Sequence, residues 1–261
     1  MSFGLGNEVN EELVNQRGVY GNVSDKYIIT PTQDIITELN KYHGFKTVGY
    51  NQANVRKKEK ANYQKHMVML EAEDSKMFDG TLRIVLFNSN DRSTSIRMYL
   101  GYYRDACAND CVFGDDLMEP VMIKHTRQDW RSSVKEMADN YLSAKQQTED
   151  MIDRMRTKKL SYGDIYKLTE KVSNDIWKGS GSILDHTQFA NAQREDDLGK
   201  DLWHTYQRIQ CNLLQGGVDR ILTHVDDGQV IKKLSNTHKV SDVSEQIRIN
   251  RLLHTACMEV A

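Results

Sequence analysis

Hydrophobic residues change their spacing once along this chain, near residue 128. From Phe45 to about His125 they recur at every second residue, which is typical of half-buried strands. Beyond Gln128 they recur every three to four residues for nearly ninety residues, which is typical of helices with one buried face. Strands followed by helices, without a strict alternation of the two, predict an α+β fold. We expect an antiparallel sheet in the N-terminal half, packed by a helical C-terminal half.

Turn and capping residues place the individual elements. Thr30 and Pro31 start a helix that should end at Gly44, because glycine adopts the left-handed conformation of many helix ends. Strands are expected at residues 63–73, 81–87, 93–104 and 121–123, with a turn at residues 78–80. Helices are expected at residues 129–158, 196–215 and 243–260. A further helix should begin after Ser161, with Asp164 as the capping partner of Ser161. A hairpin is expected around residues 226–228.

The sequence predicts a short arm and one domain. The first 24 residues are polar and have no sustained period, so we expect residues 1–26 to form a flexible arm. Residues 27–261 are expected to form a single α+β domain, sheet-rich over residues 27–127 and helix-rich over residues 128–261. Within it, Gly179-Ser180-Gly181-Ser182 is the clearest flexible joint.

Composition excludes several classes of protein. The 261 residues include 35 Lys and Arg against 37 Asp and Glu, and the resulting net charge of −2 excludes a protein that coats polyanions. No apolar run approaches the roughly 20 residues of a membrane helix, so we expect a soluble cytoplasmic protein with no membrane partner. Four scattered cysteines predict free thiols rather than a disulfide scaffold.

No catalytic signature stands out in the sequence. A nucleophile elbow, a phosphate-binding glycine loop and a His-Glu-x-x-His helix are all absent from it. We therefore expect a protein that is not an enzyme and that uses no cofactor. A metal-dependent nuclease built on acidic residues is the less favoured alternative.

Two kinds of residue group could hold a metal ion. Cys107, Cys111 and His125 offer three ligands, but a fourth is missing, and small buried thiols explain the cysteines better. Two acidic clusters could hold magnesium, although the preference of helix N-termini for acids explains the second cluster. We expect no bound metal. The clusters are Asp110, Asp115, Asp116 and Glu119, and Glu195, Asp196, Asp197 and Asp201.

Two features point toward nucleic acid. In residues 56–66, five of eleven residues are Lys or Arg against one acid, and a tyrosine lies among them. Such a segment could neutralise several phosphates, although a solvated loop between strands is an equal alternative. The basic residues are Arg56, Lys57, Lys58, Lys60 and Lys65.

The second feature is the sheet face opposite the expected core. Arg83 and Phe87 are expected to lie beside residues of the following strand, where guanidinium groups and rings could stack unpaired bases. The alternative, which we favour, is that helices cover this face too and that the tyrosines are ordinary packing residues with polar tips. The candidate residues on the following strand are Arg97, Tyr99, Tyr103 and Arg104.

The expected helix at residues 196–215 is unusually rich in amides. Its polar groups could contact a ligand or a partner chain, or could be buried structural amides, and the sequence leaves both readings open. The candidate interface residues are Trp203, His204, Gln207, Arg208, Gln210 and Asn212.

Several short motifs resemble the phage and plasmid proteins that are grouped as domain of unknown function 932. The resemblance covers the chain from about Tyr27 to its end, in the same order and at similar separations. This chain differs where Cys211 replaces a common glutamate and Leu253 replaces a tryptophan. The motifs are Leu86-Phe87-Asn88-Ser89-Asn90-Asp91, Gly101-Tyr102-Tyr103-Arg104-Asp105-Ala106-Cys107-Ala108-Asn109, residues 201–217 and Ile249-Asn250-Arg251-Leu252.

The resemblance implies a phage or mobile-element origin and the bacterial host cytoplasm as the workplace. The first hypothesis is a protein that binds single-stranded DNA in replication or recombination, with strand annealing and self-assembly into a homo-oligomer as further expectations. It depends on Lys57, Lys58, Lys65 and the strand residues 97, 99 and 103 meeting in one accessible cleft. The alternative is a counter-defence or host-takeover protein that binds and inhibits a bacterial protein.

Overall fold

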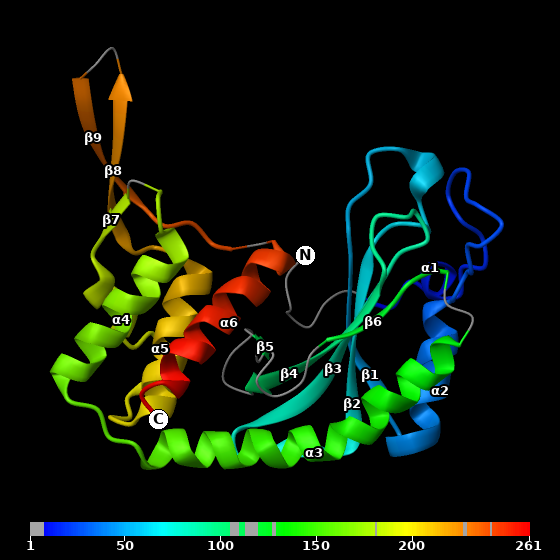
Figure 1. Ribbon diagram of the computed structural model, residues 1–261, viewed down its shortest axis with the longest axis horizontal. Helices are drawn as coiled ribbons and strands as arrows, with labels where there is room; N and C mark the ends of the chain where they lie inside the picture. The colour runs from blue at the N-terminus through cyan, green and yellow to red at the C-terminus, as the bar shows by residue number, and fades with distance from the viewer. Residues whose placement is uncertain are drawn as a thin grey trace. The chain divides into compact units, whose positions relative to one another are not determined.

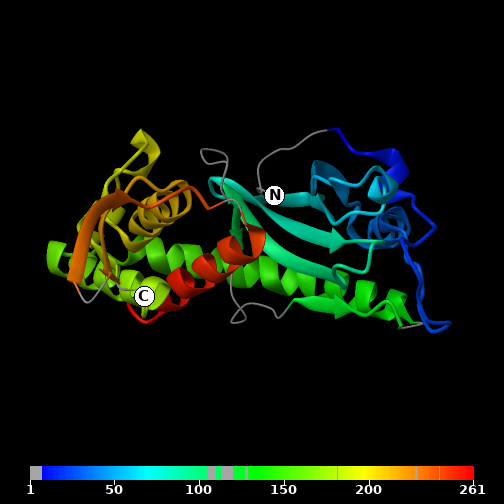
Figure 2. The ribbon, with the colours of Figure 1, turned by 90° about the horizontal axis from the view of Figure 1, so that it is seen from above.

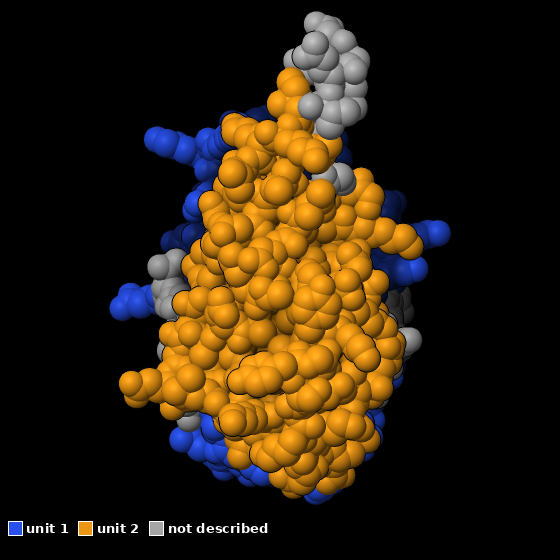
Figure 3. All heavy atoms as spheres, turned by 90° about the vertical axis from the view of Figure 1, so that its left-hand side faces the viewer, with its two compact units in different colours: residues 1–149 blue, residues 150–261 orange. Residues whose placement is uncertain are grey.

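The computed structural model describes residues 8–104, 110–112, 120–126, 129–180, 182–226, 229–240 and 242–261. The chain divides into two compact units, residues 1–149 and residues 150–261 (Figure 3). The boundary falls inside one long helix, α3 (Trp130–Thr157). The sequence gives no sign of this division, because the helical period runs through the boundary without a break.

An antiparallel sheet of six strands forms the centre of the first unit (Figure 1). Five strands follow the order β1-β2-β3-β4-β5, and β6 pairs with β4. Most strands thus pair with the strand that follows them in the sequence, which is the usual outcome of short connections. The strands are β1 (Lys46–Gln52), β2 (His66–Met77), β3 (Gly80–Asn88), β4 (Ile96–Arg104), β5 (Asp110–Val112) and β6 (Val121–Ile123).

Helix α2 (Thr32–His43) packs on one face of this sheet. It ends at Gly44, whose φ of 61° is the left-handed conformation expected there. At its other end, the Thr32 hydroxyl accepts a hydrogen bond from the Asn88 amide at 3.0 Å. Because side chains alternate along a strand, Leu82, Ile84 and Leu86 share the face of Asn88 and form the core beneath the helix.

The first half of α3 runs beside the strands of the sheet in both ribbon views (Figure 1 and Figure 2). The Tyr141 hydroxyl donates a hydrogen bond to the carbonyl oxygen of Leu82 at 3.1 Å. The Tyr141 ring also meets the Phe45 ring edge-on, with 5.1 Å between the centroids. The helix therefore shares the core that α2 covers.

The residues before α2 pack against the ends of β1 and β2. Short helix α1 (Glu11–Val14) buries Leu13 and Val14 completely. The Asn10 amide donates hydrogen bonds to Gln52 and Asn62, each at 3.2 Å. Part of the expected arm is therefore attached to the sheet.

The second unit is built around α5 (Leu202–Gln215), which is buried along most of its length. Helix α6 and the 3₁₀ helix η2 pack against it, and a small antiparallel sheet has the order β7-β8-β9. The remaining elements are α4 (Tyr162–Trp177), β7 (Ser182–Leu184), η2 (His186–Ala190), η3 (Glu195–Asp197), β8 (Asp219–Asp226), β9 (Gln229–Asn236) and α6 (Val243–Met258). In the first unit, η1 (Lys58–Lys60) is a further 3₁₀ helix.

The α+β fold class is confirmed, with the large sheet in the N-terminal half and the helices in the C-terminal half. The expected helix at residues 196–215 is wrong at its start. It begins after Asp201, whose carboxylate accepts a hydrogen bond from the backbone N–H of His204 at 3.0 Å and so fixes the N-cap. Ser182, the last residue of the expected joint at residues 179–182, is the first residue of β7. Among the described residues, no helix is long and apolar enough to cross a membrane.

The face covered by α2 and α3 should dominate the stability of the first unit. Ile84 is fully buried there, so Ile84→Ala should lower the free energy of unfolding by about 2–5 kcal/mol. Met122 on β6 is 50% exposed, and Met122→Ala should change the same quantity by less than about 0.5 kcal/mol. Urea unfolding of the two variants tests this, and equal losses would contradict the assignment of the core.

Candidate functional site

The basic segment connects β1 to β2 and folds over one end of the sheet. The backbone N–H of Ala53 donates to the carbonyl of Lys65 at 2.8 Å, which closes the base of this connection. The backbone N–H of Asn90 donates to the carbonyl of Tyr63 at 2.9 Å, which ties the connection to the turn between β3 and β4. Residues 53–65 and residues 89–95 therefore lie together at one end of the sheet.

A pocket of about 460 Å³ opens between these two connections. Four of its lining residues are basic and one is acidic, and all four basic residues belong to the predicted basic segment, residues 56–66. We call it the basic pocket. It is lined by Ala53, Asn54, Val55, Arg56, Lys57, Lys60, Gln64, Lys65, Asp91 and Ser93.

The acid in the basic pocket is already paired. The Asp91 carboxylate lies 3.4 Å from the Lys60 ammonium and accepts a hydrogen bond from the Ser93 backbone N–H at 3.0 Å. Burial acts to raise the pKa of Asp91, but the Ser93 hydrogen bonds and the Lys60 charge outweigh it and hold the pKa below its ordinary value. Asp91 is therefore ionised at neutral pH and neutralises Lys60.

The other cations of the segment are available to a ligand. Within the described part of the chain, Arg56, Lys57, Lys58 and Lys65 form no salt bridge, and the first three are exposed. Lys58 lies in η1 rather than in the pocket lining. The pocket therefore presents three cations without a counter-ion.

Two tyrosines lie next to the basic pocket. The rings of Tyr20 and Tyr63 are 6.1 Å apart between centroids, and the Lys60 ammonium lies 5.4 Å from the centre of the Tyr20 ring. Tyr63 belongs to the basic segment, whereas Tyr20 comes from the expected arm, held by a hydrogen bond from its backbone N–H to the Asn90 carbonyl at 2.9 Å. Sequence reasoning missed Tyr20 because nothing local links it to a segment forty residues away.

A buried histidine, His66, follows directly after two residues of the pocket lining, Gln64 and Lys65. His66 opens β2, and its Nδ1 donates to the Gln64 carbonyl at 3.1 Å while its Nε2 accepts from the Thr32 hydroxyl at 2.6 Å. The Asn88 amide extends this series of hydrogen bonds by donating to the Thr32 hydroxyl oxygen at 3.0 Å. Burial lowers the pKa of His66 to about 4, and weaker effects of the Gln64 carbonyl and Asp91 oppose the shift. The imidazole is therefore neutral in the folded protein at neutral pH.

The strand residues divide between the two ends of the sheet. The expected pairing is confirmed, since Phe87 lies opposite Arg97 and Thr81 lies opposite Tyr103. Arg97 and Tyr99 lie toward the end that carries the basic pocket, whereas Tyr103 lies about 13 Å further along β4. The structure thus does not bring all the predicted residues into one cleft.

Two of the predicted arginines are committed to contacts inside the first unit. Arg83 is 5% exposed, stacks 3.6 Å from the centre of the Tyr103 ring and pairs with Glu71 at 2.6 Å. Arg104 is 3% exposed and pairs with Asp79 at 2.5 Å. Tyr99 is half-buried with its ring edge-on to Phe87. These groups stabilise the sheet and leave little of its face for a ligand.

The predicted interface on α5 is mostly internal. Trp203, Gln207, Arg208, Gln210 and Asn212 are each at most 7% exposed. The Arg208 guanidinium donates to the backbone carbonyls of residues 197 and 199, the Gln210 amide to residue 250, and the Asn212 amide to residues 189 and 191. These contacts match the reading of buried structural amides, and an interface role stays a prediction.

His204 is the half-buried member of the α5 set. Its Nδ1 lies 2.6 Å from the carboxylate of Asp201. Burial acts to raise the pKa of Asp201, but the hydrogen bonds from His204 and the charge of Lys159 outweigh it and lower the pKa. The pair therefore serves the N-cap of α5.

The candidate metal ligands are not gathered into a site in the described part of the chain. No group of three or more His, Cys, Asp or Glu side chains suited to a metal occurs among the described residues. Asp197 is fully buried against Arg194 at 2.8 Å, and Asp201 is the N-cap of α5. The side chains of Cys107, Cys111, Asp110, Asp115, Asp116 and Glu119 lie outside the described residues.

These features define an α+β protein with a basic pocket at one end of an antiparallel sheet. The chain belongs to the family described as Domain of unknown function (DUF932), whose pattern matches residues 19–251. UPF0380 protein YfjQ and UPF0380 protein YafZ, both from Escherichia coli strain K12, are each 28% identical over 230 residues, which is 88% of this chain and 81% of each relative. No solved structure matches the chain.

The neutral His66 should make the stability of the first unit depend on pH. The pKa of His66 is about 4 in the folded protein and about 6.5 in the unfolded chain. Between these pH values, His66 is protonated in the unfolded chain but stays neutral in the folded protein. The free energy of unfolding should therefore fall by about 3 kcal/mol as the pH drops from about 6.5 to about 4. Urea unfolding of the protein and of His66→Gln at several pH values measures this contribution. A parallel loss in both proteins would contradict it.

Proposed function

We propose that this protein binds single-stranded DNA through the basic pocket. The observation that carries the proposal is the gathering of Arg56, Lys57 and Lys65 around one pocket of about 460 Å³, where none of them forms a salt bridge with a described residue. Unpaired cations at a concave surface attract phosphates and release condensed counter-ions on binding. A phosphate with its sugar fits a pocket of this size, so the pocket suits one point of contact along a strand.

The tyrosines beside the basic pocket suit an unpaired strand better than a duplex. Tyr20 and Tyr63 are both half-buried and lie next to Lys60. Aromatic rings next to a line of cations can stack bases that a duplex would keep inside its own stack. Phosphate contacts from the connection between β1 and β2 would leave most base edges free, as strand annealing requires.

The near balance of positive and negative charges on the chain should limit the affinity of the protein for DNA. With a net charge of −2, attraction depends on the local cluster and should fall steeply with salt. Three cations per chain support only weak binding of DNA. Assembly of several chains along one strand would raise the overall affinity. We therefore propose that the protein acts as a homo-oligomer. The proposal also includes the bacterial cytoplasm as the place of action and a role in replication or recombination.

Removal of the free cations should weaken DNA binding and its salt dependence together. The triple variant Arg56→Ala, Lys57→Ala and Lys65→Ala should lower affinity for a labelled oligothymidylate at least about tenfold at low salt. The slope of log affinity against log salt should decrease in magnitude by about two, since each phosphate contact on a single strand contributes about 0.7. Fluorescence anisotropy at several salt concentrations measures both quantities.

A charge-matched control separates the pocket from net charge. Lys41, Lys46 and Lys76 are exposed and lie around the opposite end of the sheet, where β1 begins and β2 ends. Their triple alanine variant should bind DNA like the unaltered protein, apart from a small uniform loss. Equal weakening in the two triple variants, or no binding by the unaltered protein at low salt, would reject the proposal.

A further inference from the structure

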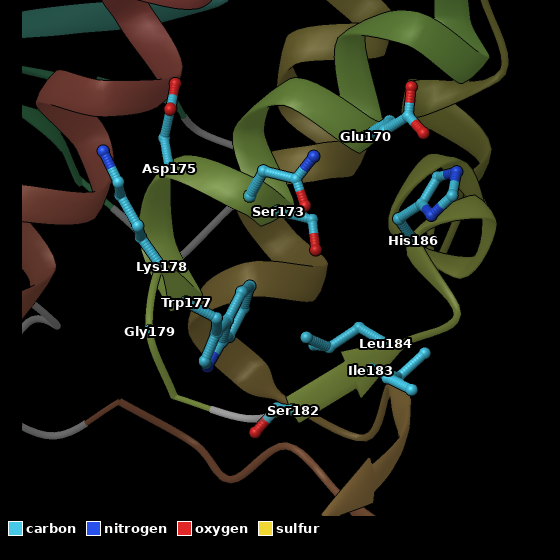
Figure 4. A pocket seen from close by; sticks show the side chains of 11 residues that line it. Glu170, Ser173, Asp175, Trp177, Lys178, Gly179, Ser182, Ile183, Leu184 and His186 are labelled. Atoms are coloured by element: carbon cyan, nitrogen blue, oxygen red, sulfur yellow. The ribbon is translucent and has the colours of Figure 1, made fainter.

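A second pocket lies within the second unit, where α4 ends and β7 begins (Figure 4). Its volume is about 570 Å³, and neither the motifs nor the proposed DNA site uses it. Gly179 turns the chain at its rim with a φ of 75°, and apart from Gly179 and its two neighbours in sequence, no atom of the described residues lies within 4 Å of the position that a Cβ would take there. The pocket is lined by Glu170, Ser173, Asn174, Asp175, Trp177, Lys178, Gly179, Ser182, Ile183, Leu184 and His186.

The pocket has an aromatic wall and an aliphatic wall. The Trp177 ring stands on one side, and the Leu184 side chain points toward it from β7 (Figure 4). Phe189 stacks on the Trp177 ring with 5.6 Å between centroids and an interplanar angle of 16°, so the indole is held in place from behind. Trp177 remains half-buried, and Ile183 is 59% exposed. This slot is shaped for a flat group or a slender chain.

The lining carries both donors and acceptors, and two of its side chains, Glu170 and His186, can accept hydrogen bonds from a ligand. Glu170 forms no salt bridge in the part of the chain that the structure describes. The Nε2 atom of His186 is buried and has no hydrogen-bond partner among the described residues, while its ring is fixed edge-on to Tyr166 with 4.7 Å between centroids. In the view of Figure 4, Glu170 and His186 lie on the same side of the pocket, whereas Asp175 and Lys178 point away from its centre. The group that fits should therefore donate hydrogen bonds and carry positive charge.

We propose that this pocket binds the side chain of an arginine presented by a partner protein. The planar guanidinium would lie on the Trp177 ring, its methylene stem would pass along Leu184, and its N–H groups would reach Glu170 and His186. Nε2 of His186 accepts such a hydrogen bond in the tautomer that carries the proton on Nδ1. The charge of Glu170 disfavours a phosphate-bearing strand at this site. The inference is independent of DNA binding by the basic pocket.

The experiment follows the indole N–H signal of Trp177 in the full-length protein by NMR. Trp177→Phe assigns that signal among the three tryptophans of the chain. The probe is the blocked tripeptide acetyl-Gly-Arg-Gly-amide, and its matched control carries citrulline, which has nearly the same shape without the charge. The arginine peptide should shift the Trp177 signal with a dissociation constant in the millimolar range and bind about fivefold or more tightly than the citrulline peptide.

Variants then test the role of the carboxylate. Glu170→Gln should weaken binding of the arginine peptide about two- to fivefold, whereas Glu136→Gln, at an exposed acid of α3, should leave it unchanged. An unshifted Trp177 signal with the arginine peptide would overturn the proposal. Equal binding of the two peptides, or a stronger response to adenosine, would also overturn it, because the site would then recognise flat shape rather than positive charge.

Discussion

The burial of β3 on both of its faces constrains the rest of the first unit. Every residue from Gly80 to Asn88 is buried, including Arg83 on the face opposite α2. A charge on such a strand must find a partner inside the protein, because an unpaired buried charge is costly. Arg83 finds Glu71 and the Tyr103 ring. Four of the predicted cations form no salt bridge in the described part of the chain and lie beyond the end of the sheet, in the connection between β1 and β2: Arg56, Lys57, Lys58 and Lys65.

That connection is positioned by polar groups as much as by apolar packing. A neutral His66, held by Thr32 and Gln64, joins the start of β2 to the start of α2. Asp91, on the neighbouring turn, is kept ionised and paired with Lys60. One acid thus neutralises one of the four basic residues in the pocket lining, and the other three form no salt bridge with a described residue. The second unit differs, because the lining of its pocket at Trp177 has two carboxylates, Glu170 and Asp175, and one cation, Lys178.

Local sequence signals predicted much of the fold. The end of α2 at Gly44, the capping box of Ser161 and Asp164, and the pairing of Asp226 with Gln229 in the hairpin all follow from residues within one turn of each other. The alternation of side chains also predicted that β3 and β4 would pair. The start of α5 was missed because apolar spacing continues past the N-cap at Asp201.

The candidate site was less predictable from the sequence. The run of cations was visible, but its pocket also needs Asp91 and Ser93 from a distant turn, and Tyr20 from the N-terminal residues. Burial of Arg104 and of the α5 amides depends on neighbours that only the folded chain provides. Residue type alone could not separate a guanidinium that binds a ligand from one that pairs with an internal acid.

Photo-crosslinking of a single strand that carries 5-iododeoxyuridine tests the central claim most directly, because it reports which aromatic side chains touch the bases. The account predicts crosslinks to Tyr63 or Tyr20, beside the basic pocket, that disappear when salt is raised. Crosslinks confined to Tyr99 and Tyr103 on the sheet, or to residues of the second unit, would contradict it.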